Sequence, residues 1–246
     1  MITLLVQLDQ LLRGESTRLE LLRRGSIDIS PGAIALMSLP LSFFSGICMG
    51  VFSLTGSGSL APMQIIASAL KMPALFFLTL VVTFPSLYVF NALVGSRLAL
   101  YSVLKLLVAA IGIMLTVLAS LGPIVAFFAV TTTSYAFMKL LNVAVFTIAG
   151  VMGGGFLLRT LHRLNLASDD TPPPASPGAP RALPVEPGAN VRNLFRIWVV
   201  VFALVGAQMA WILRPFIGDP EQPFQWFRPV TSNFFEAVWR AFQSLF

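Results

Sequence analysis

Long apolar stretches with very few charged residues limit what this chain can fold into. Five of them lie at 31–54, 74–94, 98–130, 137–158 and 194–213. A helix rises 1.5 Å per residue, so about 20 residues cross the ~30 Å hydrocarbon core of a bilayer. A membrane β-strand would alternate apolar and polar residues, whereas a helix satisfies its own backbone hydrogen bonds in lipid. We therefore predict an all-α, polytopic transmembrane helical bundle of about five spans.

The overall composition agrees with a membrane protein and disfavours several other classes. Hydrophobic residues make up 57% of the chain and charged residues 11%, against roughly 25% charged residues in a soluble domain. The net charge is +6, but no run of basic residues is longer than the pair Arg23 and Arg24. A phosphate-binding groove for nucleic acid therefore has little support, and we expect the lipid bilayer and other membrane proteins as partners.

No catalytic or metal-binding constellation is visible in the sequence. All ten acidic residues lie outside the predicted spans, so no carboxylate is placed to carry a proton or bind sodium in the membrane. The single histidine, His162, has no acid or nucleophile at close spacing, and Cys48 is the single cysteine. Three or four ligands are needed for a metal site. We predict no enzyme activity, no catalytic residue, no cofactor and no metal.

Five segments follow from the order of these features. Residues 1–30 form a cytoplasmic amphipathic segment, 31–160 a four-span membrane core, and 161–193 a cytoplasmic linker with seven prolines between 172 and 187. Residues 194–214 form the fifth span and 215–246 an aromatic interfacial tail. Ser30 before Pro31 predicts a helix entry with a polar N-cap and proline at the first helical position.

Glycines and prolines inside the spans predict where helices pack closely or bend. Pairs of small residues four apart allow close approach of a second helix, whereas an internal proline removes a backbone donor. We expect the glycine-rich residues 56–59 to form a turn before a short interfacial or re-entrant piece, and the third span to bend and continue as a tilted or re-entrant extension. The candidate packing and kink positions are Gly46, Gly50, Pro85, Pro123, Gly150 and Gly154.

Four polar residues within the spans are candidates for a polar lining. Asn91 and Asn142 are expected to make hydrogen bonds between helices. Lys105 and Lys139 lie near opposite ends of their spans, where each could extend its amine to the membrane interface. The alternative for these lysines is a fixed positive charge lining an anion or lipid-headgroup cavity.

Basic residues predict the orientation of the chain, because they accumulate on the cytoplasmic side of a membrane. With five spans and a cytoplasmic N-terminus, eleven of the sixteen basic residues are cytoplasmic and five are outside. Splitting the third span in two at Pro123 would put the five basic residues of the linker region outside, against this trend. We therefore predict a multi-pass inner-membrane protein whose N-terminus and proline-rich linker are cytoplasmic.

The last fourteen residues predict an amphipathic helix that does not cross the membrane. Aromatic and aliphatic residues follow helical spacing over 233–246, with Glu236, Arg240 and Gln243 on another face. Fourteen residues give about 21 Å of helix, which is shorter than a ~30 Å core. Trp239 and Phe242 are the candidate contact residues, either at the membrane interface or against a partner.

Residues 71–227 resemble a group of uncharacterised bacterial inner-membrane proteins. The segment TFPSLYVFN, the LLNV segment and the tail MAWILRPFIGDPEQPF carry the resemblance. It implies a bacterial inner membrane and no particular activity. The five-span plan with an interrupted second helix is also similar to the Yip family of membrane-trafficking proteins, in architecture alone.

The sequence thus predicts a non-enzymatic membrane protein that acts as an embedded scaffold or as a subunit of a larger complex. The alternative is a small channel or facilitator without intramembrane carboxylates, built around the kinks at Pro85 and Pro123. A water-filled path with a polar lining would distinguish the second function from the first.

Overall fold

A computed structural model describes residue 9 and residues 30–55, 61–93, 100–169, 188–219, 222–229 and 232–244. Its helices are α3 (Pro31–Gly50), the short 3-10 helix η2 (Val51–Thr55), α4 (Ala61–Leu93), α5 (Leu100–Thr131), α6 (Tyr135–Asp169), α7 (Gly188–Ile212) and α8 (Phe234–Gln243). The described part of the chain contains no strand. The prediction of an all-α helical bundle is confirmed.

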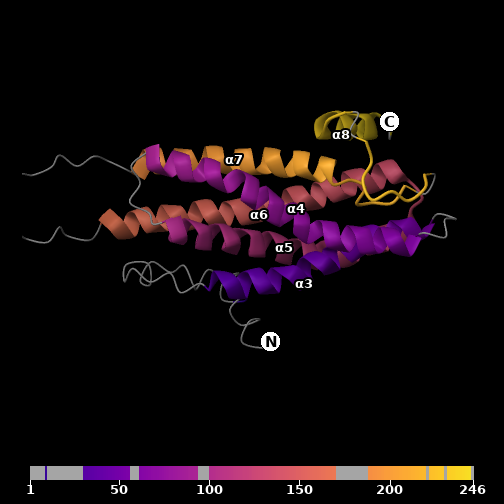
Figure 1. Ribbon diagram of the computed structural model, residues 1–246, viewed down its shortest axis with the longest axis horizontal. Helices are drawn as coiled ribbons and strands as arrows, with labels where there is room; N and C mark the ends of the chain where they lie inside the picture. Colours follow the sequence, from indigo (N-terminus) through magenta and orange to yellow (C-terminus); the bar gives the residue numbers. More distant parts are fainter. Residues whose placement is uncertain are drawn as a thin grey trace, which may run out of the picture.

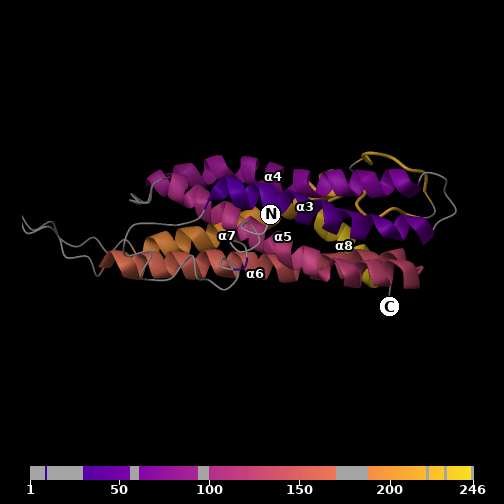
Figure 2. The same cartoon turned by 90° about the horizontal axis from the view of Figure 1, so that it is seen from below.

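The five long helices run alongside one another, and the short α8 lies outside them (Figure 1). Viewed from the perpendicular direction, α3 and α4 occupy one side of the bundle and α6 and α7 the other (Figure 2). Helix α5 packs against both α3 and α6 and joins the two sides. We call the end where α3, α5 and α7 finish the tail end, and the end where α6 finishes the linker end.

Four helical segments are long and apolar enough to cross a membrane, namely Pro31–Thr55, Pro62–Ser86, Val103–Thr131 and Tyr135–Thr160. The apolar part of α7, Arg196–Ile212, is shorter. The described structure is therefore that of a multi-pass membrane protein.

Positive charges mark two levels along the bundle. On α6, Lys139 near the tail end and Arg159 near the linker end are 20 residues apart, which is about 30 Å of helix. Arg196 and Arg214 flank the apolar part of α7, which runs from Arg196 to Ile212 and spans about 25 Å. The spacing on α6 matches the ~30 Å hydrocarbon core, whereas the apolar part of α7 is shorter than the four candidate spans.

The first helix begins as the sequence predicts. Ser30 is the N-cap of α3, and its hydroxyl accepts a hydrogen bond from the Ala33 amide at 3.4 Å, with Pro31 in the first turn. Gly46 and Gly50 lie where α3 crosses α4. A Cβ atom on Gly46 would be 2.5 Å from the carbonyl oxygen of Ser68, and one on Gly50 would be 2.8 Å from the Cα of Ile65. The two backbones approach this closely because glycine has no side chain.

Two expectations about helix boundaries are wrong. Helix α4 begins at Ala61 and continues through Pro73 and Pro85, so residues 61–73 belong to the second long helix and form no separate re-entrant piece. Helix α5 likewise continues through Pro123 to Thr131, so its last part is not a re-entrant piece, whereas the bend and tilt expected at Pro123 stay predictions. A proline removes one hydrogen bond, and the packed neighbours on either side keep both helices continuous. The bend expected at Pro85 stays a prediction.

The predicted segments 1–30 and 161–193 fall largely outside the described residues. The structure describes residue 9 and the N-cap Ser30 of the first segment, and none of 170–187 in the second. Helix α6 continues to Asp169 and α7 starts at Gly188, so helices extend into both ends of the predicted linker.

Helix α8 follows the prediction for the C-terminal segment. Asn233 is its N-cap, and the side-chain oxygen of Asn233 accepts a hydrogen bond from the Glu236 amide at 2.8 Å. Its ten residues span about 15 Å, which is too short to cross a bilayer. Glu236 forms an ion pair with Arg240 one turn later.

Candidate functional site: a lateral cavity with a cationic rim

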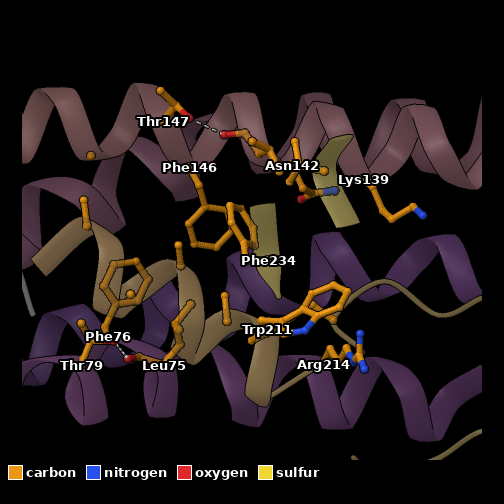
Figure 3. A pocket seen from close by; sticks show the side chains of 18 of the residues that line it. Leu75, Phe76, Thr79, Lys139, Asn142, Phe146, Thr147, Trp211, Arg214 and Phe234 are labelled. Carbon is orange, nitrogen blue, oxygen red and sulfur yellow. Dashed lines mark hydrogen bonds between the residues drawn. The ribbon is translucent and has the colours of Figure 1, made fainter. Parts of the chain in front are cut away.

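A cavity of about 1020 Å³ lies between α4, α5, α6 and α7, with the tail segment 214–232 and α8 at its tail end. Small-molecule sites are typically about 300–1,000 Å³, so this volume is sufficient for a ligand. Figure 3 shows aromatic side chains from α4, α6 and α8 together inside it, with Lys139 and Arg214 toward one end.

The walls of the cavity are mostly apolar. Phe76 of α4 and Phe146 of α6 stack with their ring centroids 6.3 Å apart, so two helices on opposite sides of the bundle meet through their side chains. At the linker end the lining residues Leu157 and Trp198 are buried, and the Trp198 indole donates a hydrogen bond to the Thr83 carbonyl at 3.3 Å. Apolar side chains therefore close the deep end of the cavity.

The cavity opens sideways between α6 and α7. Thr147, Val151 and Ala203 line it and are also exposed on the outer surface. Gly150 lines this opening, and a Cβ atom added to it would have no neighbour within 4 Å. One turn further along, a Cβ atom on Gly154 would be 3.1 Å from Val199 of α7. The two helices thus meet at Gly154 and diverge at Gly150, on the outer surface of the bundle.

Cationic side chains gather at the tail end of the cavity, where we call them the cationic rim. The rim consists of Lys139, Arg214 and Arg228, with Asp219 beside them. Lys139 lies over the Tyr135 ring at 4.6 Å, and the Arg214 guanidinium lies over the Trp211 ring at 3.8 Å. Arg228 pairs with Asp219 at 3.6 Å.

The rim has an excess of positive charge. Arg240 of α8 also lines the cavity but is paired with Glu236. Apart from that pair, the described residues at the rim are three cations and one carboxylate. The rings beneath Lys139 and Arg214 orient the two cations through cation–π contacts without neutralising them. The rim can therefore attract an anion.

Arg214 is held to the tail segment through one end of its guanidinium. Its Nη2 donates to the Pro229 carbonyl, whereas its Nε is buried without a hydrogen-bond partner among the described residues. Burial lowers the pKa of the Arg214 guanidinium from its usual value, and the charge of Arg228 contributes in the same direction. An arginine nevertheless stays protonated in proteins, so Arg214 remains cationic.

A polar stripe on α4 holds the tail segment in place. Gln64, Ser68 and Lys71 are all buried, and they follow one another at i, i+4 and i+7. The Gln64 amide donates to the carbonyls of Pro215 and Phe216 at 3.1 and 3.4 Å, and Ser68 donates to Phe216 as well. We call these three side chains the α4 polar stripe.

Lys71, the third residue of the α4 polar stripe, binds the tail segment at two further carbonyl groups. Its amine donates to the Pro215 carbonyl at 3.1 Å and to the Trp226 carbonyl, and it lies 5.0 Å from the centroid of the Phe227 ring. Non-helical backbone at membrane depth is tolerated where protein groups satisfy it. The α4 polar stripe supplies those groups and so positions Arg214 and Arg228 at the cavity.

The candidate residues from the sequence fall into three places. Lys139, Asn142, Gly150 and Gly154 line the cavity. Gly46 and Gly50 lie at the α3–α4 crossing, and Pro85 and Pro123 lie inside α4 and α5. Lys105 lies over the Tyr101 ring near the linker end and does not line the cavity. Trp239 and Phe242 lie on the outer face of α8.

The hydrogen bonds expected between helices at Asn91 and Asn142 are not among those that the structure describes. Asn142 is buried, but its amide donates to the Met138 carbonyl of its own helix at 2.8 Å, so the described hydrogen bond is not the interhelical one that was expected. Asn91 lies in the last turn of α4, and its side chain is outside the described part of the structure.

Sequence inspection missed the α4 polar stripe and the tail cations Arg214 and Arg228. The stripe could have been recognised from its i, i+4, i+7 spacing in an otherwise apolar segment. The tail cations gave no comparable indication, because their position depends on how an irregular, proline-rich segment folds back onto α4.

Comparisons with known protein families, with curated proteins and with solved structures find no match to this chain. The fold and the cavity together define a multi-pass helical membrane protein with a lateral, cation-rimmed pocket.

Proposed function

We propose that this chain is a non-enzymatic subunit of a complex in a bacterial inner membrane, where it acts as an embedded scaffold for another membrane protein. One observation carries the proposal, namely the exposed aromatic stripe on α8. Phe235, Trp239 and Phe242 are 52%, 60% and 47% exposed and follow one another at i, i+4 and i+7.

The other side of α8 is already occupied by the chain itself. Phe234 and Val238 line the cavity and Ala241 is buried, which fixes α8 on the bundle. The outer stripe is ordered as well, since the rings of Trp239 and Phe242 stack with centroids 6.0 Å apart. Aromatic anchors at helical spacing are the means by which an amphipathic helix binds a groove in a partner, and tryptophan is enriched among the residues that dominate such interfaces.

The location and orientation belong to the same proposal. The resemblance of residues 71–227 to bacterial inner-membrane proteins supports the inner membrane, and the eleven-to-five distribution of basic residues supports a cytoplasmic N-terminus. Five crossings then place the tail end, including α8, on the periplasmic side. The partner is accordingly a membrane protein with a groove at the periplasmic interface.

The test compares two double variants of the full chain. Trp239→Ser with Phe242→Ser removes the stripe, and Phe127→Ser with Val130→Ser removes two comparably exposed apolar residues from α5 near the same end. Co-purification from native membranes in mild detergent is expected to lose one stoichiometric membrane-protein partner with the first pair and to keep it with the second.

Two outcomes would overturn the scaffold proposal. One is equal recovery of the same partner with both double variants. The other combines two observations. The wild-type chain purifies without a stoichiometric partner protein, and in lipid vesicles that contain no other protein trypsin cleaves after Arg240 faster in the Trp239/Phe242 variant than in the wild-type chain. The second outcome would mean that the stripe binds the bilayer.

The alternative function, a small facilitator, has one observation in its favour, which is the cavity itself. Its lining is largely apolar and its deep end is closed by Leu157 and Trp198. A continuous polar path, which a solute facilitator would use, is not visible among the described residues. Solute flux into vesicles that contain the purified chain, above that of protein-free vesicles, would favour the facilitator.

A further inference from the structure

We propose that the lateral cavity binds an anionic phospholipid from the bilayer, with the negatively charged headgroup at the cationic rim and a hydrocarbon chain in the apolar part. This inference is independent of the α8 stripe and of any protein partner. It joins three observations, namely the chemistry of the walls, the charge and depth of the rim, and the direction in which the cavity opens.

The walls suit a hydrocarbon chain. From α5 the lining includes Leu107, Ile111 and Met114, and from α7 it includes Val199 and Phe202. Lining positions along α6 run from Lys139 to Leu157, 18 residues that cover about 27 Å of helix. This length exceeds the ~15 Å of one leaflet of a ~30 Å core. A chain anchored at the rim therefore fits within the cavity along its whole length.

The rim suits an anionic headgroup. Lys139 lies about 30 Å along α6 from Arg159, and Arg214 lies two residues beyond the end of α7 at the same end of the bundle, which is the depth expected of one headgroup layer. Arg228 adds a third cation beside them. Arginine and lysine together are the side chains that recognise phosphate oxygens in proteins.

The opening suits entry from the bilayer rather than from water. It lies between α6 and α7 on the outer surface, at Gly150, Thr147 and Ala203, and not at the end of the bundle alone. Helix α8 covers the tail end of the cavity with Phe234 and Val238. A lipid can therefore insert its chain laterally while its headgroup stays at the interface, with no need to cross an apolar barrier.

The experiment measures contact between lipid chains and the two tryptophans that line the cavity. Trp226→Phe with Trp239→Phe leaves Trp198 and Trp211, both lining residues, as the remaining fluorophores. The chain is reconstituted in phosphatidylcholine vesicles in which brominated phosphatidylglycerol, or in parallel brominated phosphatidylcholine, replaces an increasing share of the lipid. Bromine on the acyl chains quenches tryptophan on contact.

Two matched pairs of variants, made in that background, separate the rim from other charges and the cavity from other surfaces. Lys139 and Lys105 each lie over the ring of a tyrosine four residues earlier, at 4.6 and 4.9 Å, but only Lys139 lines the cavity. Gly150 and Gly155 on α6 both have open space where a side chain would begin, but only Gly150 lines the cavity. The variants are Lys139→Gln, Lys105→Gln, Gly150→Leu and Gly155→Leu.

The expected result is half-maximal quenching by phosphatidylglycerol at about a tenfold lower mole fraction than by phosphatidylcholine, the size of one charge-assisted contact. Lys139→Gln should remove most of that preference, and Gly150→Leu should reduce quenching by both lipids. Lys105→Gln and Gly155→Leu should behave as the parent protein does.

Three results would overturn the inference. Equal quenching by the two lipids would show that the rim selects no headgroup. Equal effects of Gly150→Leu and Gly155→Leu would place the lipid outside the cavity. Restoration of fluorescence by millimolar inorganic phosphate, at constant ionic strength, would make a free anion the ligand of the rim.

Discussion

Gly46→Ala is expected to destabilise the bundle at the α3–α4 crossing. The added Cβ would lie 2.5 Å from the Ser68 carbonyl oxygen, 2.7 Å from the Ala69 Cα and 2.9 Å from the Ala69 nitrogen. All three are backbone atoms, so no side chain can rotate away. Ordinary contacts need roughly 3.5–4.0 Å, and α3 and α4 must therefore separate by about 1 Å.

The size of the effect follows from that separation. A gap of about 0.5–1 Å removes a quarter to a half of the dispersion energy of the contacts it affects, and overpacking of this kind typically costs about 1–3 kcal/mol. Alanine also favours a helix over glycine by about 1 kcal/mol. Gly155→Ala, in the interior of α6 with nothing within 4 Å, gains this term without the clash and is the matched control.

The assay is thermal unfolding of the two purified variants in the same detergent, followed by circular dichroism at one heating rate. A cost of 2 kcal/mol corresponds to a difference of about 4–8 °C in Tm for a chain of this size. We expect Gly46→Ala to melt lower than Gly155→Ala by that amount. If Gly46→Ala melts at the same temperature or higher, the close backbone approach at this crossing is not a source of stability.

Three further predictions concern the tail and the orientation. Lys71→Met removes the donor to the Pro215 and Trp226 carbonyls. We expect chymotryptic cleavage after Phe227 to accelerate at least about tenfold, because a hydrogen bond to a charged group contributes roughly 1.5–3 kcal/mol. Unchanged cleavage would mean that the α4 polar stripe does not hold the tail. Asn233→Ala removes the N-cap of α8; a cost of about 1 kcal/mol should raise tryptic cleavage after Arg240 about fivefold, whereas a rate equal to wild type would argue against the cap. In a Cys48→Ser background, a membrane-impermeant thiol reagent should label a cysteine introduced at residue 244 in intact cells. It should label a cysteine introduced at residue 178 only after the cells are permeabilised. Labelling of both positions from one side would exclude the five-span topology.

The helices themselves were predictable because their cause is local. A run of apolar residues in lipid must satisfy its backbone internally, and each helix does so without reference to the others. For the same reason the N-cap Ser30 was predicted correctly, since a cap depends on the residue and its next three neighbours. The proline positions misled the prediction at 61–73 and at Pro123, because packing can keep a helix continuous where local rules favour an interruption.

The candidate site was only partly predictable. Lys139 was identified in advance as a charge that could line a lipid-headgroup cavity, because its depth in the span is a local property. That it lies beside Arg214 and Arg228 depends on the tail folding back onto α4, more than 140 residues away in sequence for the contact between Lys71 and Pro215. No periodicity in either segment encodes that contact.

By itself the sequence determined that this chain is a bundle of membrane helices and that its C-terminal helix is amphipathic. The tertiary structure alone decided which polar residues meet. Gly46 allows α3 to reach α4, while Gly150 leaves α6 and α7 apart, although both are glycines in apolar helices. Whether a small residue produces a tight contact or a cavity depends on the position of the neighbouring helix, which is set by the packing of all five helices together.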